Sequence, residues 1–241
     1  MAEWVLVTGG SQGIGRAVAV RCAAEGWRVL TLDREAPAEP LPGEEHRAVD
    51  LADPAATAAA LAGIAATHAI TRLVNNVGTV RPGTLEEASL ADLDAVIGLN
   101  LRCALQCAQT LLPAMRAAGM GRIVSIASRA MLGLHARTAY AAAKAALVGA
   151  TRSWATELAP DGITANVVAP ASVDTPLWQR LNPPGSPRRD KILANVPMRR
   201  LAAPEDVAQA VAFFLDARSG YVTGQTLFVC GGQSMGGAVL A

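Results

Sequence analysis

The stretch that decides the fold of this 241-residue chain is Trp4–Gly15, WVLVTGGSQGIG. Its first five residues are apolar or β-branched, as in a buried parallel strand. A turn with glycines at 9, 13 and 15 follows, and then a helical pattern that stops at Gly26. Strand, glycine turn and helix in this order favour dinucleotide binding, because glycines let the backbone approach a pyrophosphate at the amino end of a helix. The glycine spacing departs from GxGxxG, and a tight loop without a ligand shows the same pattern.

Strand-like and helical patterns alternate along the rest of the chain, without repeats or a linker. Further strands are expected at 28–32, 46–49, 71–75, 122–127, 163–168 and 225–229. Further helices are expected at about 53–68, 89–118 (broken only near Pro113), 138–158 and 204–215. This alternation predicts an α/β fold, a single doubly wound Rossmann-type domain over residues 1–241 with a parallel seven-stranded sheet. Residues 177–203 are rich in proline and are expected to form an irregular substrate loop or lid.

Composition excludes several classes of function. A formal net charge of +1 gives no electrostatic reason to propose nucleic acid or an anionic membrane as partner. No apolar run of about 20 residues lacks a charge or a Gly/Pro break, and no basic, apolar leader stands at the amino terminus. The four cysteines form no CxxC, and the three histidines lack ligand spacing, so no metal is expected. We expect a cytoplasmic protein.

Ser128, Tyr140 and Lys144 are the candidates for chemistry. Tyr140 and Lys144 are four residues apart in an alanine-rich helical segment, which places both side chains on one face. An ammonium beside a phenol favours the phenolate, so we expect the pKa of Tyr140 to lie below its usual value of about 10. Ser128 follows a strand, at the edge where open α/β sheets bind ligands. A tyrosine tuned in this way exchanges a proton with an alcohol or carbonyl, although a solvated helix face shows the same spacing.

Asp33 ends the second expected strand and bears on the choice of coenzyme. It follows Gly15 at about the distance where dinucleotide folds carry an acid that binds the adenosine ribose. A carboxylate there accepts a hydrogen bond from a 2′-hydroxyl and repels a 2′-phosphate, which favours NAD over NADP. Arg34 follows directly and could pair with that phosphate. Gln12 brings no basic group to the glycine turn, so NADP remains the less favoured coenzyme.

Asn100 lies inside the apolar helical run IGLNLRCAL, where its amide needs a partner. With the other motifs it carries a resemblance to a known family. The motifs are TGGSQGIG (Thr8–Gly15), NNVG (Asn75–Gly78), Asn100, Ser128, YAAAK (Tyr140–Lys144), Asn166–Pro170 and YVTGQTLFV (Tyr221–Val229). In this order and spacing the chain resembles the short-chain dehydrogenase/reductase family over essentially its whole length. It looks most like the β-ketoacyl-carrier-protein-reductase-like group.

The resemblance implies a role for each matching position. Tyr140 would be the acid/base, Lys144 would lower its pKa and hold the nicotinamide ribose, and Ser128 would donate to the substrate oxygen. Asn100 would hold a water that connects Lys144 to solvent. The positions implied to bind or border the coenzyme are Gly9, Ser11, Gln12, Gly13, Ile14, Gly15, Asp33, Asp50, Leu51, Asn76, Val77, Gly78, Tyr140, Lys144, Pro170, Val173 and Thr175. The family also implies a homotetramer, built through the long helices and the last strand.

The leading prediction is an oxidoreductase that transfers a hydride between NAD(H) and a secondary alcohol or ketone, with a small molecule as substrate. An apolar substrate is expected, because the pocket is predicted to include Val80, Met131, Leu132, Leu177 and Trp178. The alternative is an NADPH-dependent reductase of 3-oxoacyl thioesters. Such an enzyme needs a basic patch for an acidic carrier protein, for which the candidates are Arg129, Arg188, Arg189, Lys191, Arg199 and Arg200. A third reading is a cofactor-sensing regulator without catalysis, which the intact set of serine, tyrosine and lysine disfavours.

Overall fold

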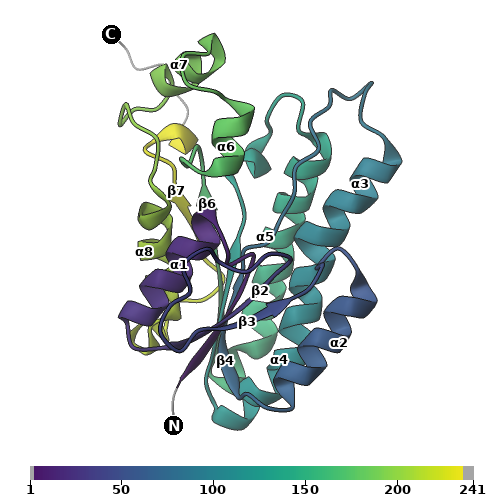
Figure 1. The fold of residues 1–241 in the computed structure, drawn as a ribbon, viewed down its shortest axis with the longest axis vertical. Coiled ribbons are helices and arrows are strands. Elements are labelled where there is room, and N and C mark those ends of the chain that lie inside the picture. Colours follow the sequence, from purple (N-terminus) through teal and green to yellow (C-terminus); the bar gives the residue numbers. More distant parts are fainter. Residues whose placement is uncertain (1–2, 236–241) are drawn as a thin grey trace.

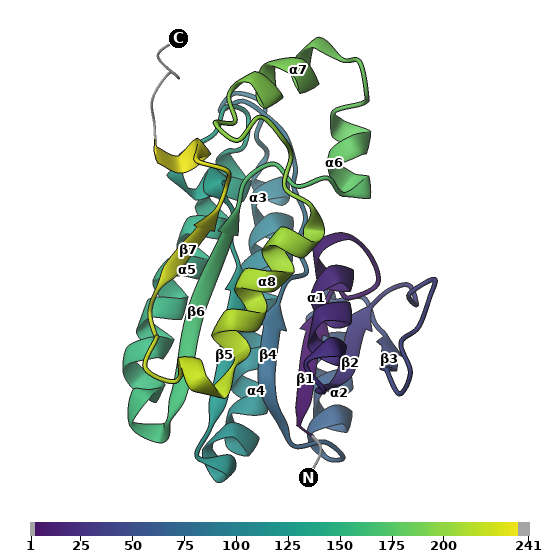
Figure 2. The ribbon, with the colours of Figure 1, turned by 90° about the vertical axis from the view of Figure 1, so that its left-hand side faces the viewer.

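A computed structural model of the chain describes residues 3–235. Its centre is a seven-stranded sheet with the order β3-β2-β1-β4-β5-β6-β7 (Figure 2). The strands are β1 (Trp4–Thr8), β2 (Arg28–Asp33), β3 (Glu45–Ala48), β4 (Ile70–Asn75), β5 (Gly121–Ile126), β6 (Ile163–Pro170) and β7 (Thr226–Val229). Every neighbouring pair of strands is parallel. The predicted α/β class and the parallel seven-stranded sheet are confirmed.

Helices cover both faces of this sheet (Figure 1). The helices are α1 (Gly13–Ala24), α2 (Pro54–Ala65), α3 (Leu90–Ile97), α4 (Cys103–Ala118), α5 (Thr138–Leu158), α6 (Pro176–Leu181), α7 (Pro187–Ala194) and α8 (Pro204–Leu215). Helices α1 and α8 pack together on one face, and α2, α4 and α5 lie on the other, as Figures 1 and 2 show. The predicted doubly wound arrangement is therefore present.

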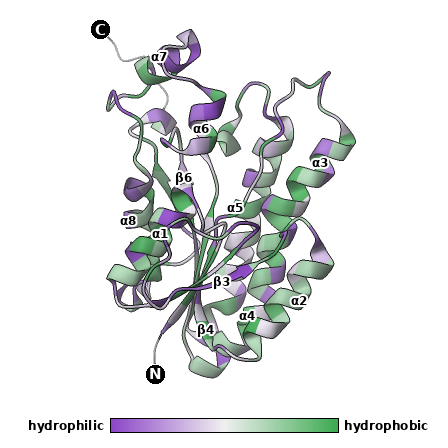
Figure 3. Cartoon of the chain, in the orientation of Figure 1, coloured by the Kyte–Doolittle hydropathy of each residue, from purple (hydrophilic) through white to green (hydrophobic). Residues whose placement is uncertain are grey.

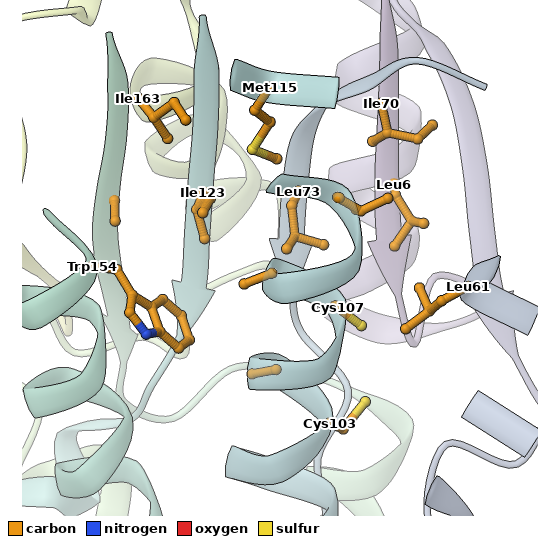
Figure 4. Close-up of a cluster of buried hydrophobic side chains, with 14 of the residues drawn as sticks. Leu6, Leu61, Ile70, Leu73, Cys103, Cys107, Met115, Ile123, Trp154 and Ile163 are labelled. Carbon is orange, nitrogen blue, oxygen red and sulfur yellow. The ribbon is translucent and has the colours of Figure 1, made fainter. Parts of the chain in front are cut away.

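The strands are buried from both sides, which explains why they are apolar at successive positions. In β1, Leu6 belongs to the core beneath α2, α4 and α5, whereas Val5 and Val7 belong to the core beneath α1 and α8. Figure 4 shows the first core, where Cys103 and Cys107 of α4 lie among aliphatic side chains. Figure 3 colours the ribbon by hydropathy and shows both hydrophilic and hydrophobic residues on α7.

The topology brings the glycine turn to a ligand-binding edge. Strands β2 and β3 follow β1 on one side of it, and β4, the next strand in the sequence, pairs with the other side of β1. Such a switch point leaves a crevice at the carboxyl ends of the two central strands. Here those ends are Thr8 of β1 and Asn75 of β4, directly before the glycine turn and Asn76.

The prediction that residues 177–203 form an irregular loop is wrong in part, because this stretch includes α6 and α7. The side chain of Thr175 accepts a hydrogen bond from Trp178 N and caps α6. The side chain of Ser186 caps α7 in the same way, through Arg189 N. Pro176 and Pro187 stand in the first turns, where a missing N–H costs nothing. Prolines that predict a loop therefore mark helix starts here.

The prediction that helix 89–118 breaks only near Pro113 is also wrong. Pro113 lies inside α4, whereas the α-helical pattern is interrupted at Gly98–Arg102, which forms a π-helical turn. This turn holds Asn100, whose amide nitrogen donates to Val96 O at 2.9 Å. Single π-turns inside α-helices often occur at functional sites.

The whole segment Leu90–Ala118 is long and apolar enough to cross a membrane by length and composition alone. Its residues Cys103, Cys107, Leu111 and Met115 lie in the core against the sheet. Its length and composition are thus those of a core helix.

Candidate active site

The glycine turn is held against the end of β4 by a small hydrogen-bond network. The amide nitrogen of Asn76 donates to Thr8 O at 2.9 Å and to Gly9 O at 3.0 Å. The hydroxyl of Thr8 accepts from the backbone of Asn76 at 3.0 Å and of Val77 at 3.1 Å. A Cβ atom on Gly15 would lie 1.9 Å from Gly9 O, so only glycine fits there. Asn76 was expected beside the coenzyme, whereas Thr8 belongs to the glycine motif without a predicted role of its own.

The amino end of α1 carries no side-chain cap. Its N-cap residue is Gln12, and its first turn contains no acidic residue. By contrast, Asp53 caps α2 by accepting from Ala55 N and Ala56 N. Free backbone N–H groups and the positive end of the helix dipole suit an anionic ligand. The uncapped helix end and the closely approached glycine turn therefore fit the pyrophosphate of a dinucleotide.

Asp33 stands at the end of β2, facing the same crevice. Its carboxylate accepts hydrogen bonds from Ser11 N at 3.2 Å and Arg34 N at 2.8 Å. The hydroxyl of Ser11 in turn donates to Glu35 O. These contacts fix the carboxylate beside the glycine turn.

Ser128, Tyr140 and Lys144 come together at the carboxyl edge of the sheet. Lys144 is buried, and its Nζ donates to Ile126 O, at the end of β5, at 2.7 Å. The same Nζ lies 5.8 Å from the centre of the Tyr140 ring. The hydroxyl of Ser128 lies near enough to Tyr140 to affect its ionisation and accepts a hydrogen bond from Ala130 N at 3.1 Å. One hydroxyl, one phenol and one amine thus share a partly buried site.

Burial dominates the ionisation of this group in the protein without coenzyme. It lowers the pKa of Lys144 to about 8. Burial also raises the pKa of Tyr140, against smaller lowering effects from the Ser128 hydrogen bond and the charge of Arg137. The expectation that the pKa of Tyr140 falls is therefore wrong for this state. The helical spacing predicted the neighbouring ammonium but not the loss of solvent around both groups.

Asn100 links the π-turn to the same site. Its amide nitrogen donates to Thr79 O and Val96 O, both at 2.9 Å, so the expected partners exist. Its amide oxygen is buried and accepts no hydrogen bond from the described residues. A Cβ atom on Gly78 would lie 2.4 Å from this oxygen and 3.5 Å from the Nζ of Lys144. The orphan oxygen and the lysine therefore face the same small space beside Gly78.

The glycine turn, Asp33, the Ser128–Tyr140–Lys144 group and Asn100 border one cavity of about 1560 Å³, larger than most single-ligand pockets. The predicted site residues that line it are Gly9, Gln12, Gly13, Ile14, Asp33, Asp50, Leu51, Asn76, Val77, Gly78, Asn100, Ser128, Tyr140, Lys144, Pro170, Val173 and Thr175. Ser11 and Gly15 do not line it and support the turn from behind. Within residues 3–235, no group of three or more His, Cys, Asp or Glu could hold a metal ion.

The lowered pKa of Lys144 makes stability depend on pH in the coenzyme-free protein. The unfolded chain has a lysine pKa of about 10.4, so above pH 8 it binds more protons than the folded chain. Lys144 should therefore add about 2 kcal/mol to the free energy of unfolding between pH 8 and 9.5. Buried Cys22, whose pKa burial raises to about 12, acts in the opposite direction over the same range, and the raised pKa of Tyr140 does so above about pH 10. Urea denaturation at pH 8.0 and 9.5 should therefore show a change in the free energy of unfolding that is about 2 kcal/mol more positive in the native sequence than in Lys144→Met. If the free energy of unfolding changed equally with pH in both proteins, Lys144 would not be desolvated in the folded state.

Comparisons with known proteins agree with this geometry. Residues 9–234 match the family model described as "Enoyl-(Acyl carrier protein) reductase". The chain is 39% identical to the (2S)-[(R)-hydroxy(phenyl)methyl]succinyl-CoA dehydrogenase subunit BbsD of Thauera aromatica, over 95% of this chain and 96% of that protein. It is 37% identical to the 3-oxoacyl-[acyl-carrier-protein] reductase FabG of Escherichia coli (strain K12), with the same coverage.

Solved structures show the same similarity. A putative NAD(P) dependent gluconate 5-dehydrogenase from Beutenbergia cavernae superposes with a TM-score of 0.89 at 36% identity, over 98% of both chains. The aldohexose dehydrogenase of Thermoplasma acidophilum gives a TM-score of 0.90 at 32% identity, over 100% of this chain and 97% of that one. The chain therefore belongs to the short-chain dehydrogenase/reductase family, within its β-ketoacyl-carrier-protein-reductase-like group, and is an NAD(P)-dependent oxidoreductase.

Proposed function

We propose that this enzyme transfers a hydride between NAD(H) and the carbon of a secondary alcohol or ketone, with Tyr140 as the acid/base. The observation that carries the proposal is that Tyr140, Ser128 and the buried Lys144 meet at the wall of one cavity with room for both coenzyme and substrate. The intact set disfavours a regulator that has lost catalysis.

A bound nicotinamide dinucleotide supplies or accepts the hydride. In oxidation, the phenolate of Tyr140 takes the proton of the substrate alcohol. In reduction, the Tyr140 hydroxyl gives its proton to the oxygen of the forming alcohol. Ser128 donates a hydrogen bond to the same oxygen and stabilises the negative charge that develops on it.

Lys144 and Asn100 support the proton transfer. The ammonium of Lys144 favours the phenolate of Tyr140 once ligands enclose the site, and its pKa of about 8 lets it exchange protons near neutral pH. The unpartnered oxygen of Asn100 faces the same space, and a water there would connect Lys144 to solvent. Asn100 thus acts as the end of a proton relay.

NAD is the proposed coenzyme, because Asp33 holds a fixed carboxylate where a 2′-phosphate would approach. Arg34 also lines the cavity, and the similar Beutenbergia cavernae structure is described with bound NADP, so the preference needs a direct test. Fluorescence titrations with NADH and NADPH measure it. Tighter binding of NADH supports the proposal, and tighter binding of NADPH assigns the selection to Arg34.

Asp33→Ala should shift this preference towards NADPH. Loss of the carboxylate removes a hydrogen bond to the ribose and a repulsive charge, so we expect the ratio of NADPH to NADH dissociation constants to fall by about 10- to 100-fold. Glu35→Ala is the matched control, because it removes an exposed carboxylate that does not line the cavity. An unchanged ratio in Asp33→Ala would remove Asp33 from coenzyme selection.

The substrate is proposed to have an apolar body. Val80, Leu177 and Trp178 line the cavity, as predicted. Met131 and Leu132 do not, and their expected place in the pocket is wrong. Met131 packs against a buried cluster with Val148, and Leu132 points outward with 57% of its surface exposed. A panel of secondary alcohols with NAD, read by the absorbance of NADH, tests the reaction.

The second candidate is an NADPH-dependent reductase of 3-oxoacyl thioesters. The matched family description and the names of the BbsD and FabG relatives, which refer to acyl-CoA or acyl-carrier-protein compounds, favour it. An NADPH preference in the titration, together with reduction of a 3-oxoacyl thioester, would move this candidate to first place.

The remaining proposals concern the setting of the enzyme. We propose one domain with α6 and α7 as its lid, a small-molecule substrate, a cytoplasmic location and a homotetramer. Exposed apolar side chains on α4, α8 and β7 support assembly, namely Leu105, Phe213 and Leu227. The four free cysteines fit a reducing compartment. Light scattering of the purified protein measures the assembly.

A further inference from the structure

Arg137 stands out among the cavity residues, because it is 8% exposed and lies three positions before Tyr140. Its Nη1 donates to Ala136 O at 2.7 Å, and its own carbonyl accepts from Ala141 N at the start of α5. Ala136 adopts a φ of +55°, a left-handed conformation that is strained for alanine. The left-handed conformation of Ala136 thus directly precedes Arg137, whose buried side chain lines the cavity.

A second arginine approaches Arg137 from the lid. Arg188 of α7 also lines the cavity. Burial lowers the pKa of Arg137, and the nearby charge of Arg188 lowers it further. Among residues 3–235 neither guanidinium forms an ion pair with a carboxylate. Arg188 is exposed, whereas Arg137 is buried, and a buried charge without a counter-ion is unfavourable unless an anion joins it.

The cavity also has four acidic residues, Asp33, Asp50, Glu87 and Asp94. Asp33 and Asp50 belong to the part expected to hold the adenosine, where Arg34 and Arg102 also line the cavity. Glu87 accepts from Thr84 N at 2.9 Å. Among residues 3–235, none of the four carboxylates forms an ion pair with Arg137 or Arg188.

Arg137 is the N-cap residue of α5, and Tyr140 lies in the first turn of that helix. Both side chains line the same cavity. Burial raises the pKa of Tyr140, and the charge of Arg137 acts on the same phenol in the opposite direction. An anion bound to Arg137 therefore shares the cavity with the oxygen that Tyr140 protonates, which suits an anionic group of the substrate itself.

The lid helices α6 and α7 contact each other through Trp178 and Arg189. The guanidinium of Arg189 stacks on Trp178 of α6 at 5.0 Å from the ring centre. The buried Asn182, between the two helices, donates to Trp178 O at 3.0 Å. Trp178 and Leu177 line the same cavity as Arg137 and Arg188.

We propose that Arg137 and Arg188 bind a carboxylate of the substrate, so that the substrate is a hydroxy acid or oxo acid with an apolar or aromatic body. The carboxylate stands a few bonds from the reacting carbon, and the body lies against Leu177 and Trp178. Guanidinium groups match the planar, two-oxygen geometry of a carboxylate. This proposal rests on the hydride transfer proposed above and names the class of substrate.

The test compares an acid with its neutral ester. With NADH, the enzyme should reduce 4-oxo-4-phenylbutanoate with a KM at least about 10-fold below that of its methyl ester. Arg137→Gln and Arg188→Gln should each raise the KM of the acid by about 10- to 100-fold and change kcat/KM of the ester by less than about 3-fold. Arg152→Gln, which removes an exposed charge from α5 outside the cavity, should leave both substrates unchanged.

A purely structural Arg137 would lower kcat/KM for acid and ester alike, and this result would overturn the proposal. Binding of 4-phenylbutanoate to the enzyme–NADH complex, measured by calorimetry, separates the two proposals. Binding that is lost in Arg137→Gln and in Arg188→Gln supports the carboxylate site even if no ketone is reduced, in which case the proposed hydride transfer fails alone. Reduction of acid and ester with equal KM overturns the carboxylate site and leaves the hydride transfer in place.

Discussion

Tyr140→Phe is expected to lose turnover by about 10³-fold or more while binding NADH with a dissociation constant close to that of the native enzyme. The ring of Tyr140 packs against the buried cluster of Val96, Ala139 and Ala143, and phenylalanine keeps that packing. The variant therefore loses only the hydroxyl that exchanges a proton with the substrate oxygen. The glycine turn and Asp33 are untouched, so coenzyme binding stays. Initial rates with the best substrate of the alcohol panel and NADH fluorescence measure the two properties.

The chain offers a matched control for this variant. Tyr221 is the other tyrosine of the sequence, and its side chain is fully exposed. Tyr221→Phe removes the same hydroxyl from a position outside the cavity and should keep both rate and binding. Turnover retained in Tyr140→Phe would contradict the role proposed for Tyr140. Loss of NADH binding in that variant would show that its effect is on folding of the site.

The features predicted best from the sequence are those set by local chemistry. A strand buried on both faces must be apolar at successive positions, and the glycine turn must accept a close backbone approach. Runs such as Trp4–Thr8 and the positions of Gly9 and Gly15 were therefore visible in the residues alone. The alternation of strands and helices then left few topologies, because crossovers between parallel strands are right-handed.

The features that were missed depend on contacts between distant segments. Proline is common in loops, so Pro176 and Pro187 predict a loop when residue type alone is considered. Each follows a capping residue, Thr175 or Ser186, and therefore begins a helix. The π-turn depends on the amide of Asn100 meeting Thr79 O, 21 residues earlier in the chain. The importance of Arg137 depends on its burial and on Arg188 from the lid, neither of which leaves a sequence pattern.

The pKa of Tyr140 shows how burial can reverse a correct local argument. The spacing places Lys144 beside the phenol, and a charged neighbour favours the phenolate. Desolvation of both groups outweighs this effect in the coenzyme-free protein, since it raises one pKa and lowers the other. Local spacing therefore predicts which groups meet, and the surrounding packing determines their charge.

Gly15→Ala is the second variant for which we expect a large effect, this time on folding and coenzyme binding together. The added Cβ would lie 1.9 Å from Gly9 O and 2.5 Å from the amide nitrogen of Asn76. Backbone oxygen cannot move as a flexible side chain can, so α1 or the glycine turn must shift and the bond from Asn76 to Gly9 O is lost. We expect the free energy of unfolding to fall by about 3 kcal/mol or more and the melting temperature by about 6 to 12 °C.

Coenzyme binding should disappear with the turn in Gly15→Ala, because the shifted backbone no longer presents the uncapped amino end of α1 to a pyrophosphate. Gly63→Ala is the matched control, since Gly63 lies in α2 with nothing within 4 Å of its added Cβ. That change should raise stability by about 0.5 to 1 kcal/mol and leave NADH binding intact. Thermal melts and NADH titrations of both variants measure these effects. An unchanged melting temperature in Gly15→Ala would contradict the close approach of the turn to α1. Unchanged NADH binding would show that this close approach is not needed for coenzyme binding.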